Sequence, residues 1–401
     1  MMNKMRVITV FTALVIVSIY LMICFIGMKT DNSSSKIKVG FLYDGDESAP
    51  YTYNFIKSQN KLDEYYQGKK VETVSRSNIP EDKGEQGLNE LIDEGCDIIF
   101  STSYGYEEAA KKLAKEHPEI QFCQATGDNA NDKPLSNYHT FMGEIYEGRY
   151  VSGIVAGMKL REMINEGIIT EDQAKVGYVG AFPYAEVISG YTAFILGVRR
   201  IVPKATMEVK YIHTWTSYSL EKKCAQELID DNCVIISQHT NTIGSAVACE
   251  EASEKGATVY HVGYNQSMVD VAPTTSLVSS RINWNPYIFG AVEAVINNKS
   301  IEKTVEGHVH GNDVGAGFKH GWVQMLDING LIAARGTEDA VNETIEKINN
   351  NEITIFKGDY TGVDPQNPED TIDLKNGYKE NEKASAPSFH YVLKDVITIS
   401  E

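Results

Sequence analysis

Hydrogen-bonding side chains stand just beyond three short apolar runs of this chain. Ser103 and Tyr104 follow the first of these runs. His239 and Asn241 follow the second, and Asn265 follows the third. Hydroxyl, imidazole and carboxamide groups can donate and accept hydrogen bonds without reacting, so they suit the reversible binding of a polar small molecule. For the asparagines, a local turn bond made by the side chain is an equally good interpretation.

Two aromatic residues and one acid stand in similar polar segments. Tyr51 and Trp215 would offer a ligand flat, polarizable faces at little cost in side-chain entropy, although each could instead cover its own half of the protein. Asp46 could accept hydrogen bonds from two hydroxyls of a ribose, but a solvated loop acid is the simpler interpretation. These residue types predict a binding site rather than a reaction centre.

Motifs that would indicate catalysis or a cofactor are absent. The sequence has no Gly-x-x-x-x-Gly-Lys-Ser/Thr phosphate loop and no Gly-x-Ser-x-Gly nucleophile elbow. Gly315 and Gly317 do not join a strand to a helix, as a dinucleotide site requires. His308 and His310 lack a third metal ligand, so a loop is the favoured interpretation. We expect no catalytic residue, metal or cofactor.

The segments around these residues alternate between two patterns. Short apolar runs predict strands, and segments with apolar residues at about 3.6-residue spacing predict helices. The predicted strands are 36–43, 71–74, 97–101, 121–126, 176–180, 207–212, 234–238 and 258–263. The predicted helices are 51–66, one ending at 89–94, 106–117, 185–199, 220–231, 246–255 and 338–349. Such alternation predicts an α/β protein with parallel sheets covered on both faces.

This order of elements occurs twice, 137 positions apart. The run Lys38–Leu42 aligns with Lys175–Val179, and 91–99 aligns with 228–236, without a gap. Two similar halves predict two lobes that face each other across a cleft. The alternative is that any two βα units share this hydrophobic spacing.

The repeat also predicts where a ligand binds. In open parallel sheets, ligands bind beyond the carboxyl ends of the strands. The predicted site residues follow strands in both halves of the chain: Asp46, Tyr51, Ser103 and Tyr104 in the first half, and Trp215, His239, Asn241 and Asn265 in the second. We therefore expect them to face one another across the cleft.

Composition narrows the class of protein further. The length of 401 residues, with 42% hydrophobic and 23% charged residues, suits two or three globular domains. A formal net charge of −18, spread over the chain, disfavours nucleic acid and anionic lipid as partners. The five cysteines beyond residue 35 form no disulfide or metal-ligand pattern, and we expect Cys96, Cys123 and Cys233, which lie in strand-like apolar runs, to be buried thiols.

The first 35 residues predict a tether. Lys4 and Arg6 precede an uncharged run, Val7–Met28, which is long enough for a spanning helix. Positive charge before such a run predicts a cytoplasmic N-terminus and an exported body. Cys24, inside the run, partly matches a bacterial lipoprotein site, so lipid attachment and an uncleaved helix both remain open. Either arrangement places the body on the extracytoplasmic face of the cell membrane, with 31–35 as a flexible spacer.

Several longer motifs together resemble one known family. They are Gly143–Tyr150, Gly153–Gly157, Val176–Pro183, Gly190–Gly197, Thr214–Trp215, Ser237–Asn241 and Asn283–Tyr287. This set resembles the basic membrane protein family, the exported substrate-binding lipoproteins of bacterial ABC importers. Several members of that family bind purine nucleosides or bases. The resemblance covers about 38–326.

The resemblance implies a type I periplasmic-binding-protein fold, in which two doubly wound parallel-sheet lobes are joined by three crossovers. On this basis 1–35 form the anchor and spacer. Lobe 1 takes 36–140 with 284–312, lobe 2 takes 141–283, and 313–401 complete the lobes.

The resemblance also implies roles for individual residues. Tyr51 and Trp215 match family positions that hold the two faces of a purine ring. Asn241 and Asn265 match polar positions near the ligand, and Lys319 matches a strand near the cleft. Family members more often carry acids at the two asparagine positions, so the charge and identity of the ligand stay open.

Three functions are compatible with these features. The first is a substrate-binding protein of an ABC importer, which closes on a purine base or nucleoside and then meets the permease. The second is a membrane-tethered sensor module of the same fold. The third is an exported nucleoside hydrolase, which the lack of a nucleophile motif or carboxylate cluster disfavours.

Overall fold

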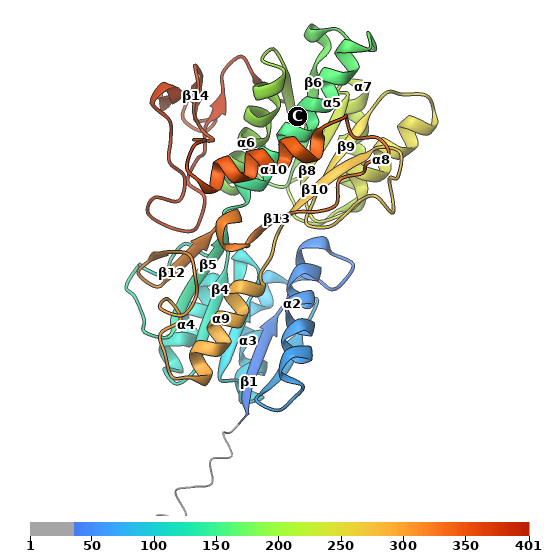
Figure 1. Ribbon diagram of the computed structural model, residues 1–401. Helices are drawn as coiled ribbons and strands as arrows, with labels where there is room; N and C mark the ends of the chain where they lie inside the picture. Colours follow the sequence, from blue (N-terminus) through green and yellow to red (C-terminus); the bar gives the residue numbers. More distant parts are fainter. Residues whose placement is uncertain (1–35, 401) are drawn as a thin grey trace, which may run out of the picture.

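The computed structural model describes residues 36–400, which form two lobes with one large sheet in each (Figure 1). Both large sheets have seven strands, and a three-stranded sheet lies in the carboxyl-terminal region. Strands of both large sheets alternate along the chain with helices, as in other α/β proteins.

Lobe 1 contains the first large sheet, which is parallel except for its last pair of strands. Its strands are, in order, β2 (Val71–Arg76), β1 (Ile37–Leu42), β3 (Ile98–Ser101), β4 (Gln121–Ala125), β5 (Tyr138–Gly143), β12 (Asp313–Ala316) and β11 (His308–His310). Phe41 packs with α2 (Pro50–Tyr66) and α9 (Asn285–Ile296), whereas its neighbour Leu42 packs with helices on the opposite face. Those helices are α3 (Gly84–Asp93) and α4 (Glu107–Glu116). Helices therefore cover both faces of the sheet.

Lobe 2 repeats this arrangement. Its strands are, in order, β17 (Ile397–Ile399), β7 (Thr206–Tyr211), β6 (Lys175–Gly180), β8 (Ile235–His239), β9 (Tyr260–Tyr264), β10 (Ser276–Ile282) and β13 (Val323–Met325). Tyr178 packs toward α5 (Ile145–Asn165) and α6 (Ala185–Ile201). The next residue, Val179, packs toward α7 (Tyr218–Asp230) and α8 (Gly244–Glu254). Because successive side chains of a strand point to opposite faces, β6 is buried against helices on both of its faces.

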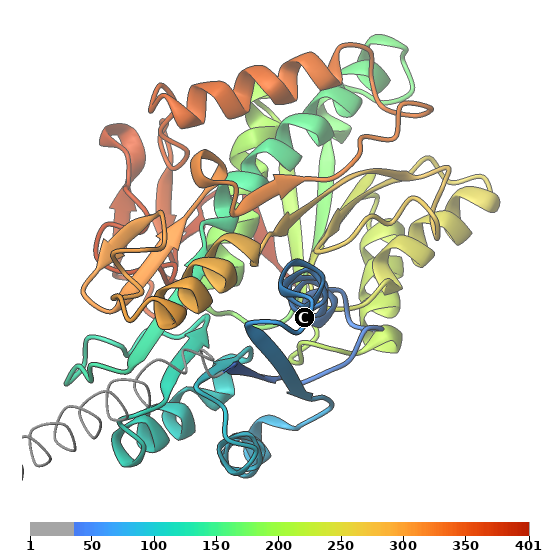
Figure 2. The ribbon, with the colours of Figure 1, turned by 60° about the horizontal axis from the view of Figure 1, so that its bottom comes forward.

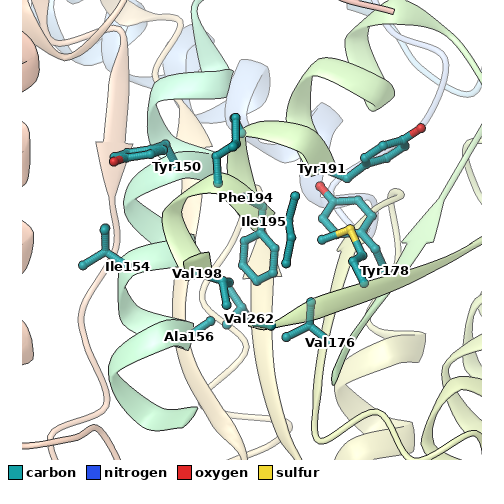
Figure 3. Close-up of a cluster of buried hydrophobic side chains, with 14 of the residues drawn as sticks. Tyr150, Ile154, Ala156, Val176, Tyr178, Tyr191, Phe194, Ile195, Val198 and Val262 are labelled. Carbon is teal, nitrogen blue, oxygen red and sulfur yellow. The ribbon is translucent and has the colours of Figure 1, made fainter. Parts of the chain in front are cut away.

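The contact between α5 and α6 depends on two glycines. A Cβ at Gly153 would lie 2.0 Å from the carbonyl oxygen of Phe194, and one at Gly197 would lie 2.1 Å from that of Tyr150. Glycine lets the two backbones approach this closely, and the flanking side chains then fill one core with those of β6, such as Val176 (Figure 3). The motifs Gly153–Gly157 and Gly190–Gly197 therefore have a packing role.

The chain passes between the lobes three times. It leaves β5 of lobe 1 for α5 of lobe 2, and it leaves β10 of lobe 2 for α9 of lobe 1. It finally leaves β12 of lobe 1 for β13 of lobe 2. The two crossover helices α5 and α9 occupy matching positions of the repeat, but each belongs to the lobe opposite its preceding strand (Figure 1).

The carboxyl-terminal region packs on lobe 2. After β13, α10 (Thr337–Asn349) lies along the outside of α5 (Figure 2). The small sheet follows, with β14 (Thr361–Val363) between β15 (Thr371–Asp373) and β16 (Val392–Leu393). Phe356, Phe389 and Leu393 belong to the core of lobe 2, and β17 pairs with β7 at the edge of its sheet.

The predicted α/β class with two parallel-sheet lobes is confirmed, and each predicted strand and helix overlaps an observed one. The predicted end of lobe 1 at 140 falls inside β5, so the chain leaves that sheet only after Gly143. The sequence does not predict β5 because it carries buried polar residues. His139, for example, is bonded to Gln121 and Glu302.

Some predictions concern residues outside the described part of the chain. The apolar run 7–28, Cys24 and the spacer 31–35 all lie there. Within 36–400, no helix combines the length and apolar character needed to cross a bilayer. The cysteines predicted to be buried, Cys96, Cys123 and Cys233, are buried and unpaired.

Candidate ligand-binding cleft

A narrow cavity lies between the two lobes, and its empty space is about 390 Å³ when the part open to solvent is included. Lobe 1 lines it with Asp44, Tyr51, Ser103, Tyr104 and Thr126, and lobe 2 lines it with Glu186, Trp215, His239, Asn241 and Tyr264. Almost all of these residues end a strand or follow one, and Tyr51 and Glu186 begin the helices after β1 and β6. This is the position at which parallel sheets bind ligands.

Tyr51 forms a fixed aromatic wall on the side of lobe 1. It stands in the first turn of α2, next to Pro50, whose ring favours a helix start. Its hydroxyl donates to the carbonyl oxygen of Thr102 at 2.6 Å, and its ring meets Trp284 edge-on at a centroid distance of 6.1 Å. These contacts hold the ring in place before any ligand arrives.

Trp215 forms the aromatic wall on the side of lobe 2. Its indole lies 5.5 Å from the ring of Phe182 and 6.3 Å from that of Tyr184, measured between centroids. The backbone N–H of Asn241 donates to the carbonyl oxygen of Trp215 at 2.9 Å, which joins the two loops. The aromatic cluster and this bond fix the indole at the cavity.

Two carboxylates give the cavity an acceptor-rich character. Asp44 accepts a hydrogen bond from the hydroxyl of Thr52 at 3.2 Å, and burial raises the pKa of Asp44 above its ordinary value. Glu186 stands in the first turn of α6, where the helix dipole favours a negative charge. Among the described residues, no lysine or arginine lines the cavity. The site therefore suits a neutral or cationic ligand that carries N–H or O–H donors.

His239 supports Glu186 from the end of β8. Its Nε2 lies 3.4 Å from Oε1 of Glu186, and its ring packs against Tyr264 at a centroid distance of 4.4 Å. Burial lowers the pKa of His239, so the imidazole is neutral near pH 7. A neutral ring with its proton on Nε2 can donate to Glu186 and hold that carboxylate toward the cavity.

The remaining lobe 1 residues complete the wall beside Tyr51. The hydroxyl of Ser103 donates to Glu81 at 2.6 Å, and Tyr104 is half-exposed at the mouth of the cleft. Thr126 has a φ of 59°, which is rare for a β-branched residue. Such local strain is often found at binding sites, and here it stands at the cavity wall.

Six of the nine predicted ligand-binding residues line this cavity. They are Tyr51, Ser103, Tyr104, Trp215, His239 and Asn241. The structure thus brings together residues that are far apart in the sequence, and it places Tyr51 and Trp215 on the same cavity. The other three, Asp46, Asn265 and Lys319, lie outside the cavity lining.

Local contacts explain these three differences. The carboxylate of Asp46 accepts bonds from Ser48 in its own turn and from the side chain of Asn78 after β2, and these bonds lower its pKa. Asn265 is buried at an inter-lobe contact, where its backbone oxygen accepts from Asn54. Lys319 is exposed in the third crossover. The predicted roles of Asp46 at a ribose and of Lys319 at a ligand oxygen have no support in this geometry.

Four cavity residues were not predicted individually: Asp44, Thr126, Glu186 and Tyr264. The sequence does predict the segments that carry them: Asp44 and Tyr264 follow predicted strands, Thr126 ends one, and Glu186 begins a predicted helix. Which side chain of the segment faces the cavity depends on the turn, and no residue pattern in the sequence indicated it.

One group of described residues could offer several metal ligands. Atoms of Asp364, Asp370 and His390 lie within 4.8 Å of one another in the carboxyl-terminal region, and all three side chains are partly exposed. This is the only group of three or more His, Cys, Asp or Glu residues within 36–400 that has such spacing. The group is separate from the inter-lobe cavity lining, although Asp364 and His390 reach the space just outside it.

Comparison with known proteins identifies a family. The family model described as ABC transporter substrate-binding protein, PnrA-like (Bmp), matches residues 36–357. A purine-binding protein of Brucella abortus is 30% identical over 329 residues, which cover 82% of this chain and 85% of that protein.

Two further comparisons extend this result. A putative ABC transporter glucose-binding protein of Haloferax volcanii is 28% identical over 302 residues, covering 75% of this chain and 69% of that protein. A solved ABC transporter solute-binding protein of Aeropyrum pernix matches with a TM-score of 0.66 and 16% identity, covering 83% of this chain and 95% of the other. That structural likeness supports the type I periplasmic-binding-protein fold expected from the sequence.

Proposed function

Because the chain belongs to the Bmp family of ABC transporter substrate-binding proteins, we propose that it binds a purine base or nucleoside between its lobes. The single observation that carries the proposal is the composition of the cavity. Two aromatic walls from opposite lobes, Tyr51 and Trp215, share it with two carboxylates, and no lysine or arginine of the described 36–400 lines it.

The chemistry of a purine matches this cavity. A purine has a flat ring for the aromatic walls and N–H donors on its edge for Asp44 and Glu186. Asn241 adds a carboxamide that can donate and accept. The purine-binding relative from Brucella abortus supports the same ligand class.

A sugar is the second candidate ligand. The relative from Haloferax volcanii is described as a putative glucose-binding protein, and carboxylates accept bonds from sugar hydroxyls as well as from N–H groups. The two aromatic walls, Tyr51 and Trp215, favour the purine because they can cover both faces of a flat ring. A direct comparison of both ligand classes decides between them.

We further propose that the protein works outside the cytoplasmic membrane as a tethered receptor for an ABC permease. Closure of the lobes excludes water from the ligand, and the permease then recognises the closed form. A sensor of the same fold would bind the same ligand but would pass the signal to another membrane partner. A hydrolase would in addition release free base from a nucleoside.

Calorimetry on residues 36–401 tests the proposal. Adenine, guanine, adenosine and guanosine are titrated into the protein, with glucose and ribose as the sugar controls. We expect saturable binding of at least one purine compound and none of the sugars. Binding of a sugar with no purine binding would overturn the ligand class. Chromatography of the nucleoside samples should show no released base.

A further inference from the structure

The family model matches residues 36–357, so the carboxyl-terminal residues 358–400 lie beyond the matched part of the chain. We call residues 358–400 the strap. Its core residues Phe389 and Leu393 are fully buried against lobe 2. The strap therefore packs into the core of lobe 2 and is an integral part of the fold.

The strap is bonded to both lobes. On the side of lobe 2, Glu380 accepts from the hydroxyl of Ser189 in α6 at 3.1 Å and from the backbone N–H of Phe389 at 3.1 Å. On the side of lobe 1, the hydroxyl of Ser385 donates to Asp313 in β12 at 2.6 Å. The strap is therefore hydrogen-bonded to lobe 2 and to lobe 1, and it crosses from one lobe to the other beside the cleft.

A second, larger chamber lies between the strap and the inter-lobe cavity. Its empty space is about 1220 Å³ when the part open to solvent is included, and it shares Tyr104, Thr126, Glu186 and Trp215 with that cavity. The strap supplies six of its lining residues: Asp364, Pro365, Gln366, Ala386, Pro387 and His390. A ligand group that leaves the cavity between Tyr104 and Trp215 therefore meets the strap.

The chemistry of this outer chamber differs from that of a phosphate site. Its acids are Asp128, Glu186 and Asp364, and none of its described lining residues is a lysine or arginine. Carboxylates accept hydrogen bonds from hydroxyl groups but repel phosphate. Phenol groups of Tyr104 and Tyr184 add flat surface and further hydrogen bonds.

We propose that the strap completes a second subsite, which holds an uncharged, hydroxyl-bearing group attached to the ligand, such as the sugar of a nucleoside. The inference rests on the proposed purine function and deepens it. The protein then binds nucleosides more tightly than free bases, and it rejects nucleotides because their phosphate meets three carboxylates.

Two variants and one control test the subsite. Ala386→Phe fills the outer chamber without touching the inner cavity, and Asp364→Asn removes one carboxylate while keeping an oxygen for the bond from the backbone N–H of Gln366. Lys383→Phe places the same bulk at an exposed strap position that does not line the chamber. Each protein is titrated with adenine, adenosine and AMP, and with guanine, guanosine and GMP. Melting temperatures report whether each variant folds.

The expected result separates base from nucleoside. Ala386→Phe weakens nucleoside binding by about tenfold or more through overpacking, while binding of the free base changes by less than about twofold. Asp364→Asn weakens nucleoside binding by up to about tenfold and leaves the base unaffected. Lys383→Phe behaves as the unchanged protein, which binds neither AMP nor GMP.

Other results overturn the subsite. Equal loss of base and nucleoside binding in both variants, or no loss in either, shows that the outer chamber holds no part of the ligand. Tight binding of AMP or GMP contradicts the charge argument. If Ala386→Phe does not fold, Asp364→Asn decides. If the unchanged protein binds no purine compound, the proposed function itself is wrong, and so is the proposal of a sugar subsite.

Discussion

Two acids in one loop, Asp44 and Asp46, show how local bonds decide the role of a residue. Asp46 accepts hydrogen bonds from Ser48 in its own turn and from Asn78 in the segment after β2. Asp44, two positions earlier, lines the cavity with only Thr52 as a side-chain donor. The carboxylate of Asp44 therefore keeps more acceptor capacity than that of Asp46, and it faces the cavity.

Trp215 is the residue whose removal should cost the most ligand affinity. We expect Trp215→Ala to weaken purine binding by about 1–3 kcal/mol, the range for stacking of a base on an aromatic side chain. Calorimetry with the best purine ligand measures the change. Tyr65→Ala is the matched control, because Tyr65 is 71% exposed on lobe 1 and far from the cavity lining. An unchanged affinity for Trp215→Ala removes the indole from the site.

At the scale of elements, Glu147 links two crossovers. It stands in the first turn of α5, just after the first crossover, and its Oε2 accepts from the backbone N–H of Phe318 in the third crossover at 2.7 Å. Burial, with the nearby charge of Glu144 in addition, raises the pKa of Glu147 to about 8. The carboxyl is therefore mostly protonated in the folded protein at pH 7.

This pKa predicts how stability depends on pH. The unfolded chain has an ordinary glutamate pKa of about 4.3, so between that value and about 8 the folded state holds more protons. The contribution of Glu147 to stability is therefore largest at low pH and is lost as the pH rises toward 8. We expect the melting temperature to fall more between pH 6 and pH 8.5 in the unchanged protein than in Glu147→Gln.

The matched control for this experiment is Glu166→Gln, at the exposed carboxyl end of the same helix. Its melting curves should follow those of the unchanged protein at every pH. Parallel pH profiles for Glu147→Gln and the unchanged protein would show that Glu147 does not titrate in this range.

At the scale of the whole molecule, the lobes touch directly across the cleft. The side-chain Nδ2 of Asn54 in α2 donates to the backbone oxygen of Asn265 at 3.0 Å, and both residues are buried. Asn265 has a φ of 66°, a conformation that asparagine tolerates better than most residues. This bond joins lobe 1 to lobe 2 directly.

The contact predicts a kinetic effect. Asn54→Ala removes a bond that exists only while the lobes are closed, so the ligand should dissociate about two- to tenfold faster, as expected for a net loss of about 0.5–1.5 kcal/mol. Stopped-flow measurement of ligand release tests this. Asn89→Ala is the control, since the side chain of Asn89 is exposed and bonds only within its own helix. Equal release rates for both variants would mean that the contact does not hold the lobes together.

Most strands and helices of this fold can be predicted from the sequence, because each depends on the pattern of apolar and polar residues within its own segment. Parallel sheets are predicted by the short apolar runs of strands such as β1, β3, β6 and β8, because a run that is apolar on both faces is buried on both faces. The 137-residue repeat predicts that there are two such sheets. The crossover strand β5 cannot be predicted in this way, because its buried polar residues are stabilised by hydrogen bonds to other segments. His139, for example, is bonded to Glu302, which is 163 positions away.

The sequence by itself determined the two lobes, the facing loops and six residues that line the cavity, because strand ends follow from local patterns and parallel strands bring their ends to one edge. Only the tertiary structure decided that Asp44 and Glu186 line the cavity while Asp46 and Asn265 do not, since the direction of a loop side chain depends on its turn and on its neighbours. It alone placed the strap beside the cleft. Residues 358–400 have no regular period, and bonds such as that of Ser385 to Asp313 join positions that only the folded chain brings together.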